Sequence, residues 1–458
     1  MQLVKSFLIV IVLVLSVACT SIRTRDAYKG SLLSNVQNGN YPGAVQLIEG
    51  AKDKSFSQKD MVLYHLYRGV LLHYNKEYAE SNESLDLAEE GIEELYTKSI
   101  SKAASSMLLN DNAFAYAGED YEDIYVNIFK ALNYINLERT ESAFVEIRKV
   151  NVKLNLLEDK YKKYANSLNS SADSRIEIQV ESTQFNNSAL ARYLSMLLYR
   201  ADDKRDDVRV DMRYLEEVFT LQANIYNFAK PDMTDFLTKK AGKTKLNLVS
   251  FTGLAPQKYP INYRVATSEN MVHIFVDDGT DVNGQSLIFP GVSAGYYFKF
   301  SVPQMQEKQS NITRIKVEVN GQEIGQLEKI EDVNRIAKET FQVKAKMSYI
   351  RAITRTVIKG IASIAAQKEI EKRSGELGGM LAKLGAAALT EASEAADLRS
   401  CIVFPGFAHI GDFDLVPGIY NINVKYIDRY GIEVYRDIFD NYEVKPNEVN
   451  LIESFFLN

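Results

Sequence analysis

The chain contains few of the residues that support disulfide or metal chemistry. Among its 458 residues there are two cysteines, Cys19 and Cys401, and four histidines. If Cys19 is modified, as argued below, Cys401 has no partner, so a fold held together by disulfides is excluded. An apolar run long enough to span a bilayer as a helix, which needs about 20 residues, is also missing near the N-terminus. There the uninterrupted apolar stretch covers only Phe7 to Leu15.

An excess of positive charge is absent as well. The formal net charge is −6, which provides no electrostatic footprint for nucleic acid. No Gly-x-Ser-x-Gly elbow, Ser/His/Asp arrangement or Cys/His arrangement is found. We therefore expect no nucleic-acid partner, no catalytic residue and no enzymatic activity. The length is sufficient for two or three domains with sizeable cores.

The N-terminus has the layout of an export signal. Lys5 precedes the apolar stretch, and the small residues Ser16 and Ala18 precede Cys19. This order resembles the lipobox of bacterial lipoproteins, although Leu is usual where Ser16 stands. The resemblance implies that residues 1–18 are a signal peptide and that Cys19 is the lipid attachment site. The alternative is an ordinary secretory signal cleaved near Ala18.

Lipidation of Cys19 implies a location. A diacylglyceryl group on its sulfur and an acyl chain on its amino group would anchor the protein firmly, because stable attachment takes more than one chain. Thr20 follows, and in the sorting of enteric lipoproteins a residue other than Asp there favours the outer membrane. We expect residues 19–30 to be a lipidated tether, the protein to face the periplasm, and no other cofactor or metal to be bound.

Residues 31–235 are predicted to form helical hairpins that resemble tetratricopeptide repeats. Gly69 is placed where two helices must approach closely, and further buried positions recur at matching offsets. The period is irregular, which indicates a degenerate repeat with insertions. Such hairpins stack into a superhelix whose concave side commonly binds a protein or peptide, while a purely structural scaffold is the alternative. The recurring residues are Tyr41, Ala44, Ile48 and Ala51; Tyr78, Ser81, Leu85 and Ala88; Ala131, Tyr134, Ala143 and Ile147; and Met196, Tyr199, Val208, Met212 and Leu215.

After about residue 245 the pattern changes to short β-branched and aromatic segments with turn residues between them. Asn320-Gly321 predicts a type I′ hairpin turn, and residues 331–342 predict a helix. The predicted fold class is therefore α+β and multidomain, with a helical repeat domain followed by a mostly antiparallel β domain that carries a helical-hairpin insert. The expected ranges are 245–345 and 399–458 for the β domain and 346–398 for the insert.

The insert contains two apolar stripes at helical spacing. Ile350, Ile353 and Val357 belong to the first, and Leu377 and Leu381 to the second. A hairpin packed on the sheet is the simpler interpretation. The alternative is an amphipathic element, within residues 350–396, that enters a membrane or pairs with another subunit.

Several segments in order resemble a family of uncharacterised bacterial lipoproteins with tetratricopeptide-like N-terminal halves and a C-terminal β domain. They are IFKALNYINL, ARYLSMLLYRADD, GLAPQK at 253–258 and AADLRSCIVFPG at 395–406. In that family Gly is usual where Met196 stands and Trp where Cys401 stands. The resemblance implies an envelope protein and transfers no catalytic residue.

Candidate chemistry is sparse. The histidines at 65, 73, 273 and 409 are expected to be structural, and His65 and His73 lie too far apart on one helix to share a metal. The residues at 277–281 indicate a turn rather than a calcium loop. The glycine-rich segment 374–379 lacks P-loop spacing. The acidic run at 118–123 predicts a solvated helix start rather than a carboxylate cluster.

Asp397 and Arg399 are placed where the insert returns to the sheet. We predict that they form a clamp through charge-assisted hydrogen bonds. Cys401, two residues further on, is expected to be a buried, inert thiol.

Taken together, these features predict a membrane-anchored periplasmic lipoprotein that acts as a non-catalytic protein-binding scaffold or adaptor in the bacterial cell envelope. Its partner would be an envelope protein or peptide bound through the helical repeats. The alternative is an oligomerising component of an envelope secretion or transport assembly.

Overall fold

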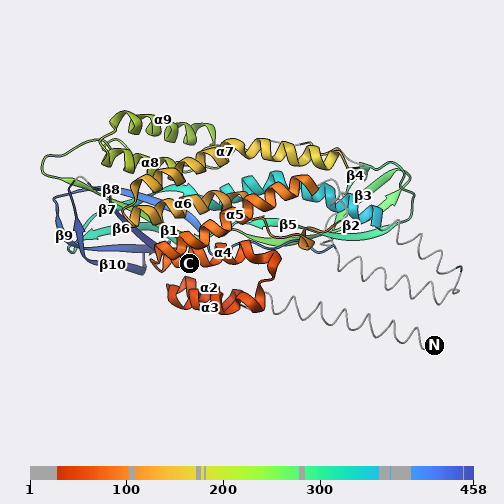
Figure 1. Cartoon of the computed structure of the whole chain (residues 1–458), viewed down its shortest axis with the longest axis horizontal. Coiled ribbons are helices and arrows are strands. Elements are labelled where there is room, and N and C mark those ends of the chain that lie inside the picture. Colours follow the sequence, from red (N-terminus) through yellow and green to blue (C-terminus); the bar gives the residue numbers. More distant parts are fainter. Residues whose placement is uncertain are drawn as a thin grey trace.

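Helices occupy the N-terminal half of the protein and strands most of the C-terminal half (Figure 1). The structure, a computed structural model, describes residues 28–102, 109–171, 177–179, 182–277, 284–359, 372, 394–446 and 448–458. The α+β class predicted from the sequence is confirmed.

The helical half consists of four consecutive hairpins whose helices lie side by side in Figure 1. Within each hairpin the two helices are joined by three residues. The helices are α2 (Lys29–Gln37) and α3 (Tyr41–Ser55), α4 (Met61–Tyr74) and α5 (Tyr78–Lys102), α6 (Asp120–Asn136) and α7 (Thr140–Asn169), and α8 (Ala189–Ala201) and α9 (Arg205–Leu221).

The four hairpins share one turn geometry. In each, the residue two places before the second helix has a positive φ, and these residues are Gly39, Lys76, Glu138 and Asp203. The N–H of the following residue donates to a carbonyl five residues earlier, as from Asn40 to Asn35. This is the Schellman arrangement, which satisfies carbonyls that the end of a helix leaves unpaired. The same local chemistry therefore ends the first helix of every hairpin.

The second helices also bury equivalent positions. Residues three, seven and ten places after the start of each are buried or partly buried, as the sequence spacing predicted for most of them. They are Ala44, Ile48 and Ala51; Ser81, Leu85 and Ala88; Ala143, Ile147 and Val150; and Val208, Met212 and Leu215.

Gly69 lies where α4 packs tightly against Leu85 of α5. A Cβ built on Gly69 would lie 2.6 Å from Cδ2 of Leu85, inside van der Waals contact. We expect Gly69→Ala to lower the free energy of unfolding by about 1–3 kcal/mol, because overpacking forces neighbouring atoms apart. Gly50, in the exposed interior of α3, has no atom near its Cβ position, so Gly50→Ala should raise stability by about 0.5–1 kcal/mol. Urea unfolding of both variants tests this, and equal midpoints would contradict it.

The larger sheet has seven strands in the order β10-β9-β6-β7-β8-β1-β11. Neighbours pair antiparallel except β1 and β11, which are parallel. Asp437 of β10 meets Ser454 of β11, so the sheet nearly closes into a barrel. The strands are β1 (Thr244–Leu254), β6 (Ile312–Val319), β7 (Gln322–Asp332), β8 (Pro405–Leu415), β9 (Gly418–Asp428), β10 (Glu433–Val444) and β11 (Asn450–Phe456).

Strand β1 shows how this barrel joins the helices. Leu246 and Leu248 point into the apolar barrel interior. Val249 and Phe251 belong instead to the core shared with the helices. Alternate side chains of a strand face opposite sides, so one strand serves both cores. The turn between β6 and β7 contains Asn320 and Gly321 with φ of 48° and 82°, and both positive values fit the predicted type I′ turn.

A second sheet of four strands lies at the other end of the molecule, in the order β4-β3-β2-β5. A helix over residues 333–359 packs against it through Ile353 and Val357. The boundary predicted at residue 346 falls inside this helix, because no Gly or Pro interrupts the chain between 333 and 359. The strands are β2 (Gln257–Ser268), β3 (Met271–Val276), β4 (Gln285–Ile288) and β5 (Tyr297–Gln306).

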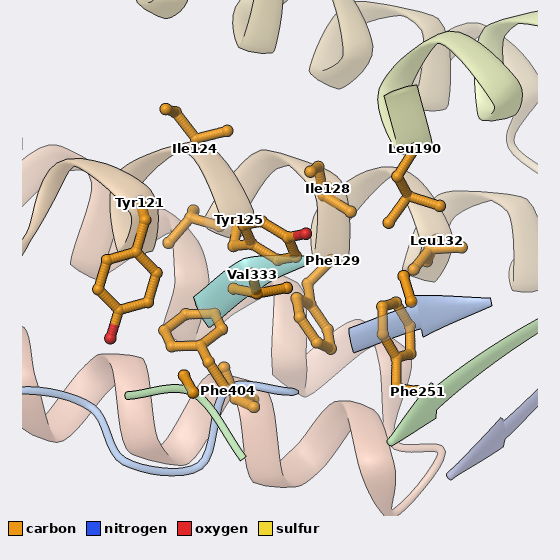
Figure 2. Packing of buried hydrophobic residues seen from close by; sticks show 14 of the residues in the cluster. Tyr121, Ile124, Tyr125, Ile128, Phe129, Leu132, Leu190, Phe251, Val333 and Phe404 are labelled. Carbon is orange, nitrogen blue, oxygen red and sulfur yellow. The ribbon is translucent and has the colours of Figure 1, made fainter. Parts of the chain in front are cut away.

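One hydrophobic core spans the helices and the β half. Figure 2 shows Phe129 and its neighbours on α6 beside Phe251, Val333 and Phe404. The ring centroid of Phe129 lies 5.6 Å from that of Phe251 and 5.8 Å from that of Phe404. The two halves therefore share an interior made from residues that are far apart in sequence.

Candidate functional site

Residues 394–404 cross the face of α4 and α6 that is turned toward the strands, which we call the inner face. The hydroxyl of Tyr67 donates to the carbonyl of Ser400 (3.0 Å) and that of Tyr74 to the carbonyl of Val403 (2.9 Å). Tyr67 and Tyr74 are seven residues apart, about two helical turns, so both hydroxyls point from one side of α4. The inner face holds this segment through its backbone.

Glu122 provides the contact from α6. Its Oε1 accepts from the N–H of Cys401 (2.7 Å), and its Oε2 accepts from the hydroxyl of Tyr116 (2.6 Å) and the N–H of Glu119 (2.9 Å). Burial, followed by the nearby charge of Glu119, raises the pKa of the Glu122 carboxyl. Four hydrogen-bond contacts therefore hold a fully buried acid between helix and segment.

The acidic run at 118–123 begins a helix, as predicted, but it is buried rather than solvated. Glu119 pairs with Lys344 (3.2 Å) and with Lys258, and Asp120 pairs with Lys160. The expectation of a solvated start is wrong, because these cations come from α7, β2 and the helix over 333–359. Only the tertiary fold brings them to the run.

Asp397 and Arg399 form a bidentate ion pair. Nε of Arg399 lies 2.8 Å from Oδ1 of Asp397, and Nη2 lies 2.6 Å from Oδ2. Nη1 reaches Asp60 (3.2 Å) and the carbonyl of Phe114 (3.0 Å), and the guanidinium lies 5.4 Å from the ring centroid of Tyr116. The predicted pair thus reaches well beyond its own segment, to the helical half.

Two further arginines, missed in the sequence, enter the same region. Arg351 donates to Asp111 (2.7 Å) and Arg355 to Glu394 (2.7 Å), and both also reach the carbonyl of Leu109. Both side chains are buried. The sequence did contain a signal for them. Arg351 and Arg355 are four residues apart within an apolar stripe, and a helix places residues at that spacing on the same face, which is buried here.

Of the two cysteines, Cys401 lies within the described residues and Cys19 does not. Cys401 is buried, and burial raises the pKa of its thiol, so it is an inert apolar group as expected. Cys19 lies outside the described residues, and so do the segment 374–379 and most of the predicted insert, residues 360–393 apart from 372.

The histidines are separated in the fold. His73 is buried, with Nδ1 2.6 Å from Oδ1 of Asn133 and Nε2 3.1 Å from Glu453. His409 is buried in β8, and burial lowers its pKa to about 3, while burial and nearby Lys52 lower that of His65 to about 4. His273 contacts Ser268 and Ser286 in the small sheet.

Asp277, the described part of the 277–281 run, pairs with Arg264 and Lys299. In the described parts of the chain, no cluster of three His, Cys, Asp or Glu side chains is arranged to bind a metal ion. Among the same residues, no helix combines the length and the apolar character needed to cross a membrane.

Comparisons with protein-family models, with curated proteins and with solved structures found no match.

Proposed function

We propose that the protein is a lipid-anchored, periplasmic scaffold or adaptor of the bacterial cell envelope that binds a partner protein without catalysing a reaction. The anchor rests on the signal-like N-terminus that ends at Cys19. The proposal includes membership of the lipoprotein family that the sequence resembles. It also includes a tetratricopeptide-like class for the four hairpins, which the shared turns and the equivalent buried positions support.

The observation that carries the proposal is the role of the buried charged groups. Glu122 and Arg399 both hold residues 394–404 against the helical half, Glu122 by accepting from the N–H of Cys401 and Arg399 by pairing with Asp60. A catalytic group must reach a reacting atom in a substrate pose, whereas these groups are engaged in a joint between the two halves. The arrangement favours a binding role over an enzymatic one.

The inner face is not the surface we propose for the partner, because the chain's own segment covers it. The partner would instead meet α7, where Val145, Val152 and Leu156 are 47%, 54% and 56% exposed. Offsets of seven and eleven residues place the three side chains on one side of a helix. We call them the outer stripe. Exposed apolar groups aligned in this way are typical of protein interaction surfaces.

In-cell photo-crosslinking tests this function. A photoreactive residue at Val152 should give one discrete adduct, which should disappear when Val145→Asp and Leu156→Asp are added. The same probe at Glu90, an exposed position on α5, is the matched control and should give none. Cys19→Ser should release the protein from the membrane or block its processing, and should abolish the adduct. Normal anchoring of that variant would refute the lipid anchor, and an adduct insensitive to the stripe changes would refute the surface.

The oligomerising alternative depends on residues 350–396, of which residues 360–393 lie outside the described residues apart from 372. No observation on the described residues favours it.

A further inference from the structure

The four hairpin turns meet the β half in two different ways. The hydroxyl of Tyr435 lies 3.7 Å from the position that a Cβ on Gly39 would take. The ammonium of Lys76 lies 5.2 Å from the ring centroid of Phe439, and Glu138 pairs with Lys445 (3.6 Å). The first three turns thus contact β10 and the residue after it. The fourth turn, at Asp203, instead borders a pocket of about 400 Å³. This volume lies within the range of about 300–1,000 Å³ that is typical of small-molecule sites.

The pocket is rich in positive charge. Its walls are the fourth turn, the segment over 236–243, the start of β1 and parts of β8 and of residues 448–449. Four acidic side chains also line it, namely Asp202, Asp203, Asp414 and Glu448. The six cationic side chains are Arg200, Arg205, Lys239, Lys240, Lys243 and Lys245.

Two positive charges are therefore in excess, in a chain whose net charge is −6. The excess persists when the partners just outside the pocket are included. Lys204 pairs with Asp202 and Lys445 with Glu448, which adds two cations. Asp412 pairs with Arg200 and Asp235 with Lys240, which adds two anions. The local charge is thus not a consequence of the overall composition.

The acidic residues hold the cations in place. Asp414 lies 2.8 Å from Nζ of Lys240 and 3.1 Å from Nζ of Lys245. Arg200 is also fixed in place, because it donates to Asp412 (2.9 Å) and Asn247 (2.8 Å) and its guanidinium lies 4.1 Å from the ring centroid of Phe236. Such shared pairs order the cations and leave positive charge for a further anion.

Lys243 completes the set, because it forms no ion pair within the described structure. We infer that this pocket binds a ligand that carries a phosphate group. A phosphate monoester has a charge of about −1.5 to −2 at neutral pH and a phosphodiester a charge of about −1, so the excess of two positive charges can balance either. Several separate ammonium and guanidinium donors suit its oxygens, which accept charge-assisted hydrogen bonds. The inference does not depend on the proposed scaffold function.

The ligand phosphate has two sources, a soluble phosphorylated compound or a lipid headgroup. Calorimetry on the full chain in detergent distinguishes them with two probes at constant ionic strength, inorganic pyrophosphate and dihexanoyl phosphatidylglycerol. The test variant is Lys240→Ser with Lys243→Ser. Asp414 keeps Lys245 as a partner in this variant, so the fold should persist, and an unchanged melting temperature checks this.

The matched control is Lys162→Ser with Lys163→Ser on α7. It also removes two exposed lysines, one of which forms an ion pair and one of which forms none with the residues that the structure describes. Pyrophosphate binding that weakens about tenfold or more in the pocket variant, but not in the control, supports the inference with a soluble ligand. The same pattern with phosphatidylglycerol alone supports it with a headgroup. If neither probe binds, or if the pocket variant binds as tightly as the wild type, the inference is wrong.

Discussion

Arg399→Ala should lower the free energy of unfolding by about 3–5 kcal/mol, the range measured when one member of a buried ion pair is removed. Arg399 is almost fully buried and contacts Asp397, Asp60 and two carbonyls of the loop before α6. The substitution would take a buried guanidinium away from the buried carboxylate of Asp60 and from the partly buried carboxylate of Asp397. Urea unfolding of the purified protein measures the loss, and a lower melting temperature should accompany it.

Two further variants make this result specific. Arg209 is exposed, and among the described residues its ion-pair partner is Asp206 alone, so Arg209→Ala should change stability by less than about 1 kcal/mol. Arg399→Lys keeps the charge but not the planar fork, so it should recover part of the loss. An unfolding midpoint for Arg399→Ala equal to that of the wild type would show that the pair does not clamp the joint.

Glu331→Gln should remove a loss of folding stability that the wild-type protein shows as pH rises. The loss arises where β7 meets the start of α8. Glu331 is fully buried in β7, where it accepts from the hydroxyls of Tyr226 (2.8 Å) and Ser188 (3.2 Å). Within the described residues it forms no ion pair with a cation. Burial therefore raises the pKa of its carboxyl from 4.5 to about 7.

The sign of the effect follows from the raised pKa. Between about pH 4.5 and 7 the folded state holds a proton on Glu331 that the unfolded state has released, so the contribution of Glu331 to stability is complete below pH 4.5 and is lost as pH rises through 7. The amide of Gln does not titrate. The free energy of unfolding of Glu331→Gln, measured relative to the wild type, should therefore rise by on the order of 3 kcal/mol between pH 4 and pH 8. Unfolding curves at several pH values measure this difference.

Glu89 on α5 provides a control of opposite sign. Burial alone would raise the pKa of its carboxyl, but Lys153, Lys130 and Asn127 lower it by a larger amount, so the net shift is downward. Glu89→Gln should therefore be destabilising at neutral pH and approach the wild type in acid. If the Glu331→Gln difference did not change with pH, Glu331 would not be the titrating group.

Local patterns in the sequence were sufficient to predict most of the helices, strands and turns. Tyr41, Tyr78 and their counterparts start helices where the spacing placed them, Gly69 lies at the predicted close approach, and Asn320-Gly321 forms the predicted turn. Each of these features depends on residues within one or two turns of chain. Hydrophobic period, glycine and turn chemistry act over that distance.

The contacts that hold residues 394–404 against the helices could be predicted from the sequence only in part. The pairing of Asp397 and Arg399 could be predicted because only one residue separates them in the sequence. Their contacts with Asp60 and the use of Glu122 to hold Cys401 join residues about 280 to 340 positions apart. No local pattern indicates which distant residue will supply the partner. The solvated start predicted for the acidic run failed for the same reason.

By itself, the sequence determined the main helices and strands and the turns between them, because each depends on near neighbours along the chain. Only the tertiary structure decided that residues 394–404 cover the inner face, that β1 pairs in parallel with β11, and that the fourth turn borders a cationic pocket. Those outcomes depend on which distant surfaces bury each other best, and that free energy belongs to the folded chain as a whole.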